Sequence, residues 1–518
     1  MSTTRRLLLC AALLAGVPAG AAAQTPTFTN ETGTRLTFGA TDGSERSFAV
    51  ADYDQDGADD VLVGRRVGLN NNTGSPLGNL LFMNLGGVLT NQEAALAPAL
   101  VAPRRTRDVV TADFNADGWP DAMVGDGPSD APLLLLNQGA VAGVWQGLVS
   151  QPLLLPVGFT VDCWSLGVGD LTNDGDAYPD VFVGVRNGND RMLVNLGPGP
   201  GGWLGFADES TRLGTNANTN AVRSVTIRDM NNDGDQDIVQ GVTGTGLLRM
   251  LKNDGAGQFT TTPQNILQNA TYNHGLGDLN DDGLLDIFCV NNGVDSYVLN
   301  NGPAAADGIG LGSFTNAPNP SGFGAAVRVA DIDGNGSDDF LVADLDQEFP
   351  QDCARRLAFL FNSGSVPFLS NGYPTPQPWT PNGTSDVAVL DIDGDGDLDL
   401  VIGHCAGTSV FMQDGSPNPP VTFIRGDSNG DGAVNVADPV YALNYLFNSG
   451  PQTCIDAMDV NDDGTVNIAD GVAVLAFLFS GGVEPESPHP ACGQDPTTDD
   501  PGLPTPGELG CDASAACP

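Results

Sequence analysis

Lysine is nearly absent from this chain. Of the 518 residues, Lys and Arg together make 20 and Lys252 is the only lysine, whereas Asp and Glu make 64, so the formal net charge is −44. A surface of this charge repels nucleic acid and anionic lipid, and we expect neither as a partner. A P-loop is excluded as well, because Lys252 does not follow a Gly-x-x-x-x-Gly run.

Histidine is also scarce. His274, His404 and His489 lie far apart in the sequence, which argues against a His-rich zinc site, and no His-Glu-x-x-His motif is present. The pair His404-Cys405 follows an expected strand, and adjacent side chains usually point apart, so we do not predict a nucleophile there. We therefore predict no catalytic residue, and paired carboxylates are the one catalytic arrangement left open in a chain so rich in aspartate.

Long apolar runs are confined to the N-terminus. Residues 1–23 carry Arg5 and Arg6, continue with the apolar run Leu7–Val17 and end in three alanines. This order predicts a secretory signal peptide cut near Ala23, and the run is too short to favour the alternative, a membrane anchor. We expect a secreted protein, extracellular or at the cell surface, without a transmembrane segment. Eight cysteines would remain after cleavage, an even number consistent with disulfides.

Acidic residues are abundant, but almost all of them are aspartate, with 56 Asp and 8 Glu. Glutamate would serve a solvated surface equally well, whereas aspartate is favoured where a short carboxylate must bend back on a tight loop. The chain also contains 68 glycines, which supply the sharp turns of such loops. The composition therefore indicates turns and calcium loops rather than an acidic tail.

These aspartates belong to an internal repeat. The pattern Asp-x-[Asp/Asn]-x-[Asp/Asn]-Gly-x-x-Asp occurs six times. A seventh, stretched copy begins at Asp170, and successive copies are 49 to 61 residues apart. Each copy lies between two short apolar runs, and two further runs follow it, the first of them ending near Asn and Gly. The copies begin at Asp52, Asp113, Asp170, Asp229, Asp278, Asp331 and Asp391.

Four short strands per unit predict one four-stranded sheet for each repeat. Such a sheet cannot bury both of its faces alone, but sheets arranged radially cover one another, so seven units predict a mainly β fold, a seven-bladed β-propeller. A calcium β-helix is the alternative, but it would need a nonapeptide period. Two segments compete to complete the last blade, and the sequence leaves open which one closes the ring: Pro26–Glu31 and Val421–Ile424.

The loops are expected to bind calcium. Ca²⁺ takes six to eight oxygen ligands, and carboxylates at positions 1, 3 and 5 of a tight loop would converge on it, with position 9 closing the shell. Plain Asp/Gly turns are the alternative, and they are favoured most in blade three, where Thr172 is a weak ligand. The expected ligands are Asp52, Asp54, Asp56, Asp60, Asp113, Asn115, Asp117, Asp121, Asp170, Thr172, Asp174, Asp180, Asp229, Asn231, Asp233, Asp237, Asp278, Asn280, Asp282, Asp286, Asp331, Asp333, Asn335, Asp339, Asp391, Asp393, Asp395 and Asp399.

With these loops, residues 25–420 resemble FG-GAP/VCBS repeats, the calcium-loop blades of integrin-α-like propellers. The resemblance implies mainly structural metals and a propeller face that binds proteins or glycans. It rests on the loops, because the Phe-Gly and Gly-Ala-Pro landmarks of the family are not clear in this sequence.

Two twelve-residue loops of EF-hand type follow, 32 residues apart. Oxygen side chains occupy positions 1, 3, 5, 9 and 12, and a backbone carbonyl would fill position 7. A helical apolar run follows each loop. With the blades, the loops would take up to nine calcium ions, which add 18 positive charges to the net charge of −44. The expected ligands are Asp427, Asn429, Asp431, Ala433, Asn435 and Asp438, then Asp459, Asn461, Asp463, Thr465, Asn467 and Asp470.

Two such loop-helix units, covering roughly residues 425–480, resemble a type I dockerin domain. The resemblance implies a cohesin-like partner, bound mainly through loop positions 10 and 11. Here these positions are apolar, where cellulosomal dockerins often carry Ser-Thr, and an internal calcium-stabilised stalk or sorting module is the alternative. The expected partner-binding residues are Val436, Ala437, Ile468 and Ala469.

The chain is therefore expected to have four segments: a signal peptide at 1–23, the propeller at 24–424, the dockerin-like domain at 425–480 and a Pro/Cys-rich tail at 481–518. Cys454 and the three cysteines of the tail allow three disulfide pairings. For the four propeller cysteines, buried free thiols and disulfides are both open.

Two hypotheses for function follow. The first is a binding or adhesion module whose propeller face takes a glycan or an extracellular protein and whose dockerin-like domain attaches it. The alternative is an extracellular polysaccharide-degrading enzyme, a lyase or a glycoside hydrolase, because related propellers include polysaccharide lyases and dockerins often accompany such enzymes. Arg, Tyr and Asp clustered outside the metal loops on one face would favour the enzyme, and a flat face with scattered Trp and Asn would favour binding.

Overall fold

The computed structural model covers the chain and describes these residues: 26–37, 45–65, 77–127, 131–216, 221–243, 247–261, 266–267, 271–280, 282–302, 311–318, 322–345, 357–363, 366, 368–371, 381, 383–413, 424–430, 432–448, 455–461, 466–485 and 489–490. The expected signal peptide, the Cys-rich end of the tail, Asp431, Asp463 and Thr465 lie outside them. No described helix is long and apolar enough to cross a bilayer.

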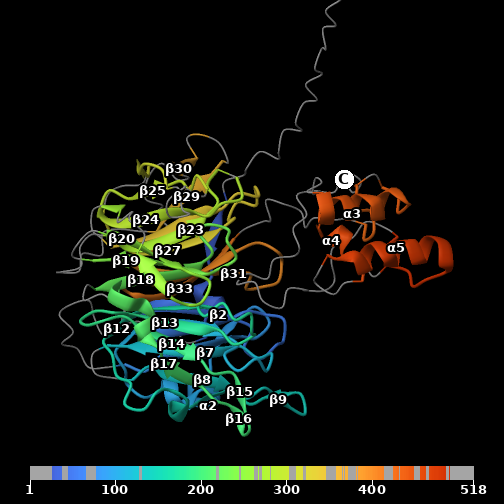
Figure 1. Cartoon of the computed structure of the whole chain (residues 1–518). Coiled ribbons are helices and arrows are strands. Elements are labelled where there is room, and N and C mark those ends of the chain that lie inside the picture. The colour runs from blue at the N-terminus through green and yellow to red at the C-terminus, as the bar shows by residue number, and fades with distance from the viewer. Residues whose placement is uncertain are drawn as a thin grey trace, which may run out of the picture.

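Seven antiparallel sheets form a ring (Figure 1). In each sheet the first strand lines the centre of the ring, and the metal-loop motif connects it to the second strand. The first four blades are β2 (Glu45–Ala51), β3 (Asp60–Arg65), β4 (Leu80–Asn84) and β5 (Leu89–Asn91); β6 (Thr106–Ala112), β7 (Asp121–Asp126), β8 (Leu133–Asn137) and β11 (Leu148–Ser150); β12 (Cys163–Gly169), β13 (Asp180–Val185), β14 (Arg191–Asn195) and β17 (Phe206–Asp208); β18 (Val222–Arg228), β19 (Asp237–Val242), β20 (Leu247–Asn253) and β21 (Phe259–Thr261).

The last three blades follow the same order, and the seven-bladed propeller predicted from the sequence is confirmed. A short pairing of β24 with β27 links blades five and six. The strands are β23 (Thr271–Gly277), β24 (Asp286–Gly293), β25 (Ser296–Val298) and β26 (Thr315–Asn316); β27 (Gly322–Ala330), β28 (Asp339–Leu345), β29 (Ala358–Asn362) and β30 (Leu369–Asn371); β31 (Thr384–Leu390), β32 (Asp399–His404), β33 (Gly407–Gln413) and β1 (Phe28–Asn30).

The N-terminal strand closes the ring. β1 pairs with β33, so the fourth strand of blade seven comes from the start of the propeller, with Phe28 opposite Gln413 and Asn30 opposite Phe411. Of the two segments that competed for this place, Pro26–Glu31 therefore provides the strand. The other, Val421–Ile424, lies outside the described residues except for Ile424, which is not in a strand.

Short elements decorate the blades. They are the helices α1 (Thr32–Arg35) and α2 (Glu93–Leu96), 3₁₀ turns at Pro98–Leu100, Pro152–Leu154 and Ser210–Asn216, the strand β22 (Ile266–Leu267), which also pairs with β20, and two hairpins, β9 (Ala140–Val141) with β10 (Val144–Trp145) and β15 (Pro198–Gly199) with β16 (Gly202–Trp203).

The core is divided among the interfaces between blades. The described residues form seven buried apolar clusters, and each joins two neighbouring blades. Side chains alternate along a strand, so Val61 and Val63 of β3 pack toward blade seven while Leu62 packs toward blade two. This explains why the second strand of each repeat is a continuous apolar run: both of its faces are covered by other blades.

The C-terminal unit contains α3 (Ala437–Asn448), α4 (Ile455–Met458) and α5 (Ile468–Ser480). These helices stand apart from the blades in Figure 1. α5 begins at a capping box: the Asn467 side chain accepts the Ala469 N–H at 2.8 Å, and Asp470 accepts the Asn467 N–H at 2.8 Å. It ends at Gly481, whose φ of 64° is left-handed.

Candidate functional site

Each blade loop is a tight turn built around its first aspartate. In blade one, Asp52 accepts the N–H of Asp56 at 3.1 Å and that of Gly57 at 2.9 Å. Gly57 has a φ of 90°, a conformation that favours glycine, which explains the glycine at position 6. The equivalent aspartate binds the N–H at position 6 in the other blades too: Asp113, Asp170, Asp229, Asp278, Asp331 and Asp391.

Position 4 of the loop is also left-handed, which the motif alone did not predict. It carries a positive φ of 52° to 56° on four non-glycine residues, and in blades six and seven a glycine relieves this strain. The glycines at position 4 of some repeats were the feature of the sequence that could have indicated this left-handed backbone. The residues are Gln55, Ala116, Asn173 and Asn232, then Gly334 and Gly394.

The aspartate at position 9 is buried and fastens the loop to the blade. Asp60 accepts the Tyr53 N–H at 3.0 Å with one oxygen and the Asn84 N–H, at the end of the third strand, at 2.7 Å with the other. The same two bonds, to loop position 2 and to the third strand, are made in all seven blades by Asp121, Asp180, Asp237, Asp286, Asp339 and Asp399.

Burial makes ionisation of these carboxyls unfavourable. Burial first, and neighbouring loop carboxylates to a lesser degree, raise the pKa of Asp60, Asp121 and Asp339 to about 8 and that of Asp399 to about 7. The pKa values of Asp180, Asp237 and Asp286 rise to about 6 for the same first reason. A bound cation would favour the charged forms, so the electrostatics suit a metal.

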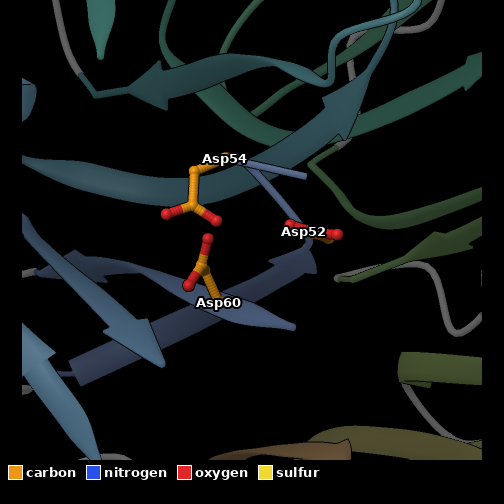
Figure 2. Close-up of side chains that lie close together, drawn as sticks. All are labelled: Asp52, Asp54 and Asp60. Carbon is orange, nitrogen blue, oxygen red and sulfur yellow. The ribbon is translucent and has the colours of Figure 1, made fainter. Parts of the chain in front are cut away.

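Three side chains converge in the loops that carry aspartate at position 3. In blades one, six and seven the carboxylates at positions 1, 3 and 9 lie within 4.8 Å of one another. Figure 2 shows Asp54 and Asp60 facing each other with Asp52 beside them. In blades one, five and six a buried oxygen of position 3 accepts no hydrogen bond from a described residue: Asp54 Oδ1, Asn280 Oδ1 and Asp333 Oδ1. In blade seven Asp393 accepts a hydrogen bond from Arg35 at 2.8 Å. An all-oxygen set of this kind fits a hard cation such as Ca²⁺.

Position 5 does not join this group in blades one and seven. Asp56 accepts the Ala58 N–H at 3.0 Å, and Asp395 accepts the Asp397 N–H at 3.2 Å, so each supports the turn that follows. The expectation that positions 1, 3 and 5 converge thus differs from the structure, which groups positions 1, 3 and 9. The reason is that position 5 lies at the outer bend of the loop, while position 9 is carried back to its centre by the second strand.

Blades two, four and five have a contact between positions 3 and 5. The amide of Asn115 donates to Asp117 at 3.0 Å, and Asn231 and Asn280 donate in the same way to Asp233 and Asp282, both at 2.9 Å. In the stretched loop of blade three, Thr172 lies 3.5 Å from Asp170 through its hydroxyl, and its N–H donates to Asp180 at 3.0 Å. Asp174 accepts the Asp176 N–H at 3.1 Å.

An amide belt, whose role was not predicted, joins the blades beside these loops. Asn137 donates its amide to the carbonyl of Tyr53 in the preceding blade at 2.8 Å. Asn84 donates across the closure of the ring, to Ile392 of blade seven at 2.9 Å. The Asn that ends the third run of each repeat was the signal. Asn195, Asn253 and Asn300 make the same bond to the preceding blade.

In the dockerin loops, the aspartate at position 12 is buried and accepts backbone N–H groups. Asp438 and Asp470 are fully buried, and each accepts the N–H of position 9, Asn435 and Asn467, at 2.7 and 2.8 Å. Asp427 at position 1 accepts the Gly432 N–H at 2.7 Å. Each loop is therefore joined to the first turn of its helix, α3 or α5. In the same loops Asp459 is buried, while Asn429 and Asn461 direct their N–H groups toward the position 12 aspartates at 3.3 and 3.4 Å.

Two short motifs coincide with the first dockerin loop and have no exposed role there. Arg425-Gly426-Asp427 spells an adhesion tripeptide, and 426–430 also fits the Gly-x-Ser-x-Gly pattern of hydrolases. Arg425 is completely buried and donates to the carbonyl of Asp459 at 2.6 Å. Ser428 is 1% exposed within the loop. Arg425 thus holds the two loops together, and Ser428 is enclosed within the first loop.

The expected partner-binding positions are exposed. Val436 and Ile468 are 54% and 53% exposed, and Ala437 and Ala469 are exposed beside them. Val440 and Val472, one helical turn further, are 62% and 56% exposed. The two loop-helix units therefore present equivalent apolar stripes.

The other face of the ring carries a different group of side chains. Arg107, Arg186 and Arg223 surround Trp164, and Tyr272 lies under Arg223 at 4.7 Å from the ring centroid. This combines the Arg and Tyr expected of the enzyme with the Trp expected of a binding face. Elsewhere, His404 is 8% exposed and contacts Ser409 at 2.9 Å; Cys163 and Cys289 are buried free thiols, and Cys405 is disulfide-bonded.

Comparison with protein families matches two parts of this architecture. Residues 278–342 match the FG-GAP-like repeat, and residues 425–478 match the dockerin type I domain. The chain is thus a seven-bladed β-propeller that contains an FG-GAP-like repeat and carries a type I dockerin domain. Both resemblances noted in the sequence are confirmed. No curated protein matches the chain.

Several solved structures are similar to the chain at low sequence identity. A structure of an Agrocybe aegerita lectin, described as recognising non-reducing terminal N-acetylglucosamine, is 16% identical, with 66% of this chain and 94% of that chain covered and a TM-score of 0.42. BBS1N in complex with ARL6DN is 11% identical, with 73% and 96% covered and a TM-score of 0.42. Streptogramin B lyase is 11% identical, with 76% and 99% covered and a TM-score of 0.44. The propeller fold is established by the strand pairing of this chain itself.

Proposed function

We propose that this protein is an extracellular binding propeller, stabilised by calcium, that is attached to a larger assembly through its dockerin domain. A type I dockerin implies a cohesin partner and bound calcium. The observation that carries the binding role is a central cavity of about 460 Å³, which is lined by side chains from the inner strands of all seven blades. A cavity of this size, with convergent polar groups, is typical of a ligand site. A glycan or an extracellular protein segment is the proposed ligand.

In this proposal the blade loops and dockerin loops hold calcium through the acidic and amide side chains named above. Calcium would neutralise carboxylates that burial otherwise disfavours in the charged form. The metals act on stability, because the loops connect the inner strands to the second strands at the edge of every blade. Thermal unfolding of the mature chain in calcium and in a chelator tests this part. A large fall of the midpoint on chelation is expected, and an unchanged midpoint would contradict it.

Attachment would use the apolar stripes of α3 and α5. Val436 and Ile468 occupy equivalent positions of the two loop-helix units, so either unit could present the same surface to a cohesin. Their apolar character replaces the polar positions of many dockerins and would select a cohesin with an apolar face. The alternative role, a stalk or sorting module, predicts that no cohesin binds.

The test of the binding role is a glycan array probed with the mature chain in calcium and in chelator. Binding in calcium that disappears with chelation is the expected outcome. If no glycan binds while the protein is folded, a protein ligand replaces the glycan in the proposal.

The second candidate function is a polysaccharide lyase, and the position of Tyr272 favours it over other enzymes. Elimination next to a uronate needs a cation near the carboxylate and a base for the adjacent proton. Arg223 lies over the Tyr272 ring, 4.7 Å from its centroid, so a cation and a candidate base lie side by side. Incubation with uronate polysaccharides, followed by ultraviolet absorbance for the unsaturated product, tests it, and Tyr272→Phe should abolish any turnover.

A further inference from the structure

Every inner strand carries a β-bulge at the same place. In each pairing between the first and second strands the register shifts by one residue near the start of the inner strand. A bulge leaves one residue unpaired and turns its side chain away from the regular alternation. The seven bulge residues form what we call the bulge ring: Arg46, Arg107, Trp164, Arg223, Tyr272, Ala325 and Ser385.

The bulge ring lies at the opposite end of the inner strands from the metal loops. Arg107 precedes Asp113 by six residues, about 20 Å of extended chain. Five members of the ring line the central cavity: Arg107, Trp164, Arg223, Ala325 and Ser385. The ring is asymmetric, because cationic and aromatic residues occupy blades one to five and small residues occupy blades six and seven. We call the part of the lining made by Arg107, Trp164 and Arg223 the charged wall and the remainder the open wall. The remainder includes Asp108 and the ion pair of Arg328 with Asp386 at 2.6 Å.

The charged wall concentrates positive charge in a strongly acidic protein. The guanidinium carbons of Arg107, Arg186 and Arg223 lie 5.5, 5.1 and 5.4 Å from the centroid of the Trp164 ring. Arg223 also lies over Tyr272. The aromatic rings thus hold three of the chain's 19 arginines together against their mutual repulsion. Their ring faces are occupied by guanidinium groups, so they position the arginines instead of stacking on a ligand.

Arg107 is the member of the bulge ring whose guanidinium group lacks hydrogen-bond partners in the described part of the chain. It is only 7% exposed, and none of its three guanidinium nitrogens has a hydrogen-bond partner among the described residues. The nearest carboxylate, Asp162, is 3.9 Å away and accepts a hydrogen bond from Asn187 with its other oxygen. Burial and the two neighbouring arginines lower the pKa of Arg107 to about 10. A buried guanidinium that makes no hydrogen bond to the described chain and has only one long ion pair is costly to keep, so this arrangement is suited to receive an anion.

The open wall provides hydroxyl and amide groups. Ser47, Ser224, Thr226, Asn273 and Ser385 line the cavity beside the arginines. Groups of this kind can pair with the hydroxyls of a sugar. Ser47 and Ser385 already donate, to Asp108 at 2.8 Å and to the Gly403 carbonyl at 2.9 Å, so they would accept from such hydroxyls. Ala325 and Ser385 are short and leave room at the ring where blades two to five place large side chains.

We propose that the bulge ring binds the carboxylate of a uronic acid residue in an acidic polysaccharide. Arg107 and Arg223 hold the carboxylate, Trp164 and Tyr272 fix the arginines, and the serine and asparagine side chains of the open wall contact the sugar hydroxyls. This inference rests on the proposed glycan-binding function and names the class of its ligand.

Calorimetric titration of the mature chain in calcium with trigalacturonate, and with galactotriose as the neutral counterpart, tests the inference. Trigalacturonate is expected to bind, more weakly as sodium chloride rises, while galactotriose does not. Arg107→Met and Arg223→Gln should each weaken binding about tenfold or more. Arg212→Gln, which removes a charge that pairs with Glu209 outside the ring, is the matched control and should leave binding unchanged.

A stability readout separates a lost site from a lost fold. Arg107→Met replaces a buried charge that makes no hydrogen bond to a described residue by an apolar chain, and Asp162 keeps its hydrogen bond from Asn187, so the thermal midpoint should stay close to that of the wild type while binding is lost. Arg223 is half-exposed in the wild type, so Arg223→Gln provides a second variant.

Each outcome decides between the proposals. Equal binding of both trisaccharides, unaffected by either arginine variant, would overturn the uronate site and leave a glycan-binding function intact. Binding of poly-glutamate but not of trigalacturonate, with the same dependence on Arg107, would overturn the sugar and identify an acidic protein segment. If neither trisaccharide binds and the glycan array is also negative, the proposed glycan-binding function fails together with the inference.

Discussion

At the scale of single residues, the buried polar side chains of the blades make hydrogen bonds that the repeat pattern does not reveal. The aspartate at loop position 9 accepts two backbone N–H groups in every blade, and the asparagine after the third strand reaches the preceding blade. The repeat pattern predicted both residues, but not these bonds. They depend on which backbone groups of a neighbouring blade come within reach, and that information is not local to the repeat.

Asn137→Ala tests the amide belt. Asn137 is 3% exposed; it donates to the carbonyls of Tyr53 and Pro120 and accepts the indole N–H of Trp145 at 2.7 Å. Its loss leaves several buried polar groups without partners, so we expect a loss of about 3 kcal/mol in the free energy of unfolding. Urea unfolding in calcium measures it. Gln138→Ala, at the exposed next position, should cost little, and equal effects at the two positions would contradict the belt.

His274→Gln tests a pH dependence built into the inner strands. His274 is 4% exposed, its Nδ1 lies 2.7 Å from the Ser224 hydroxyl, and burial lowers its pKa to about 4. The unfolded chain takes up the proton near pH 6.5 and the folded chain only near 4. The contribution of His274 to the free energy of unfolding is therefore complete above pH 6.5 and decreases as the pH falls toward 4. At pH 5 it is smaller by about 2 kcal/mol.

The comparison of interest is the difference in unfolding free energy between pH 7.5 and pH 5, measured for the wild type and for His274→Gln. The variant should lose less stability than the wild type over this interval. Acid effects on the calcium loops are common to both proteins and cancel in the difference. An identical loss in the two proteins would show that His274 does not titrate between folded and unfolded states.

At the scale of the element, the sequence predicted loops better than strand ends. The runs around each loop became the first two strands of their blades, because tight Asp/Gly turns define where those strands end. The ends of the fourth strands, such as the start of β26 at Thr315 and of β30 at Leu369, were not predicted. These strands are two or three residues long and are selected by pairing with the third strand. The bulge ring was not predicted at all, because a bulge is a property of two paired strands.

Gly125→Ala tests the packing of an element against its neighbouring blade. A methyl group at Gly125 in β7 would lie 2.4 Å from the sulfur of Cys163 in the next inner strand. We expect a loss of about 1–3 kcal/mol from overpacking. The double variant Gly125→Ala with Cys163→Ala should recover part of this loss, because the smaller side chain frees the space. Gly33→Ala, where no atom lies within 4 Å, is the control; without any recovery in the double variant, the contact with Cys163 would not be the cause.

Val436→Asp combined with Ile468→Asp tests the two helix faces as docking surfaces. Charges at both equivalent positions should weaken binding to a cohesin by at least about tenfold, because a buried unpaired carboxylate opposes association. Each single variant should have a smaller effect, since the other stripe remains intact. Surface plasmon resonance against a panel of cohesins measures this. Unchanged binding of the double variant would place the partner elsewhere on the domain.

At the scale of the whole molecule, the propeller is a closed ring whose seven core clusters are all interfaces between blades. The number of blades could be predicted by counting loops, and the closure could not, because both candidate strands have suitable composition. The closure depends on which strand pairs with the free edge of β33, and in the structure β1 pairs with it. The amide of Asn84 then completes the belt across the same seam, so the start and the end of the propeller are joined by backbone and side-chain bonds together.

Phe28→Ala tests the closure. Phe28 is 7% exposed, and its ring centroid lies 5.6 Å from that of Phe359 in blade six, so β1 adds an apolar anchor between blades six and seven as well as the pairing with β33. Truncation of this anchor should cost about 3 kcal/mol of unfolding free energy. Thr29→Ala, at the exposed neighbouring position, should change stability little. Because an uncovered β33 presents an open sheet edge, we also expect the Phe28 variant to self-associate on size-exclusion chromatography. A monomeric Phe28→Ala protein of wild-type stability would mean that the ring is held closed by blades one and seven without their shared strand.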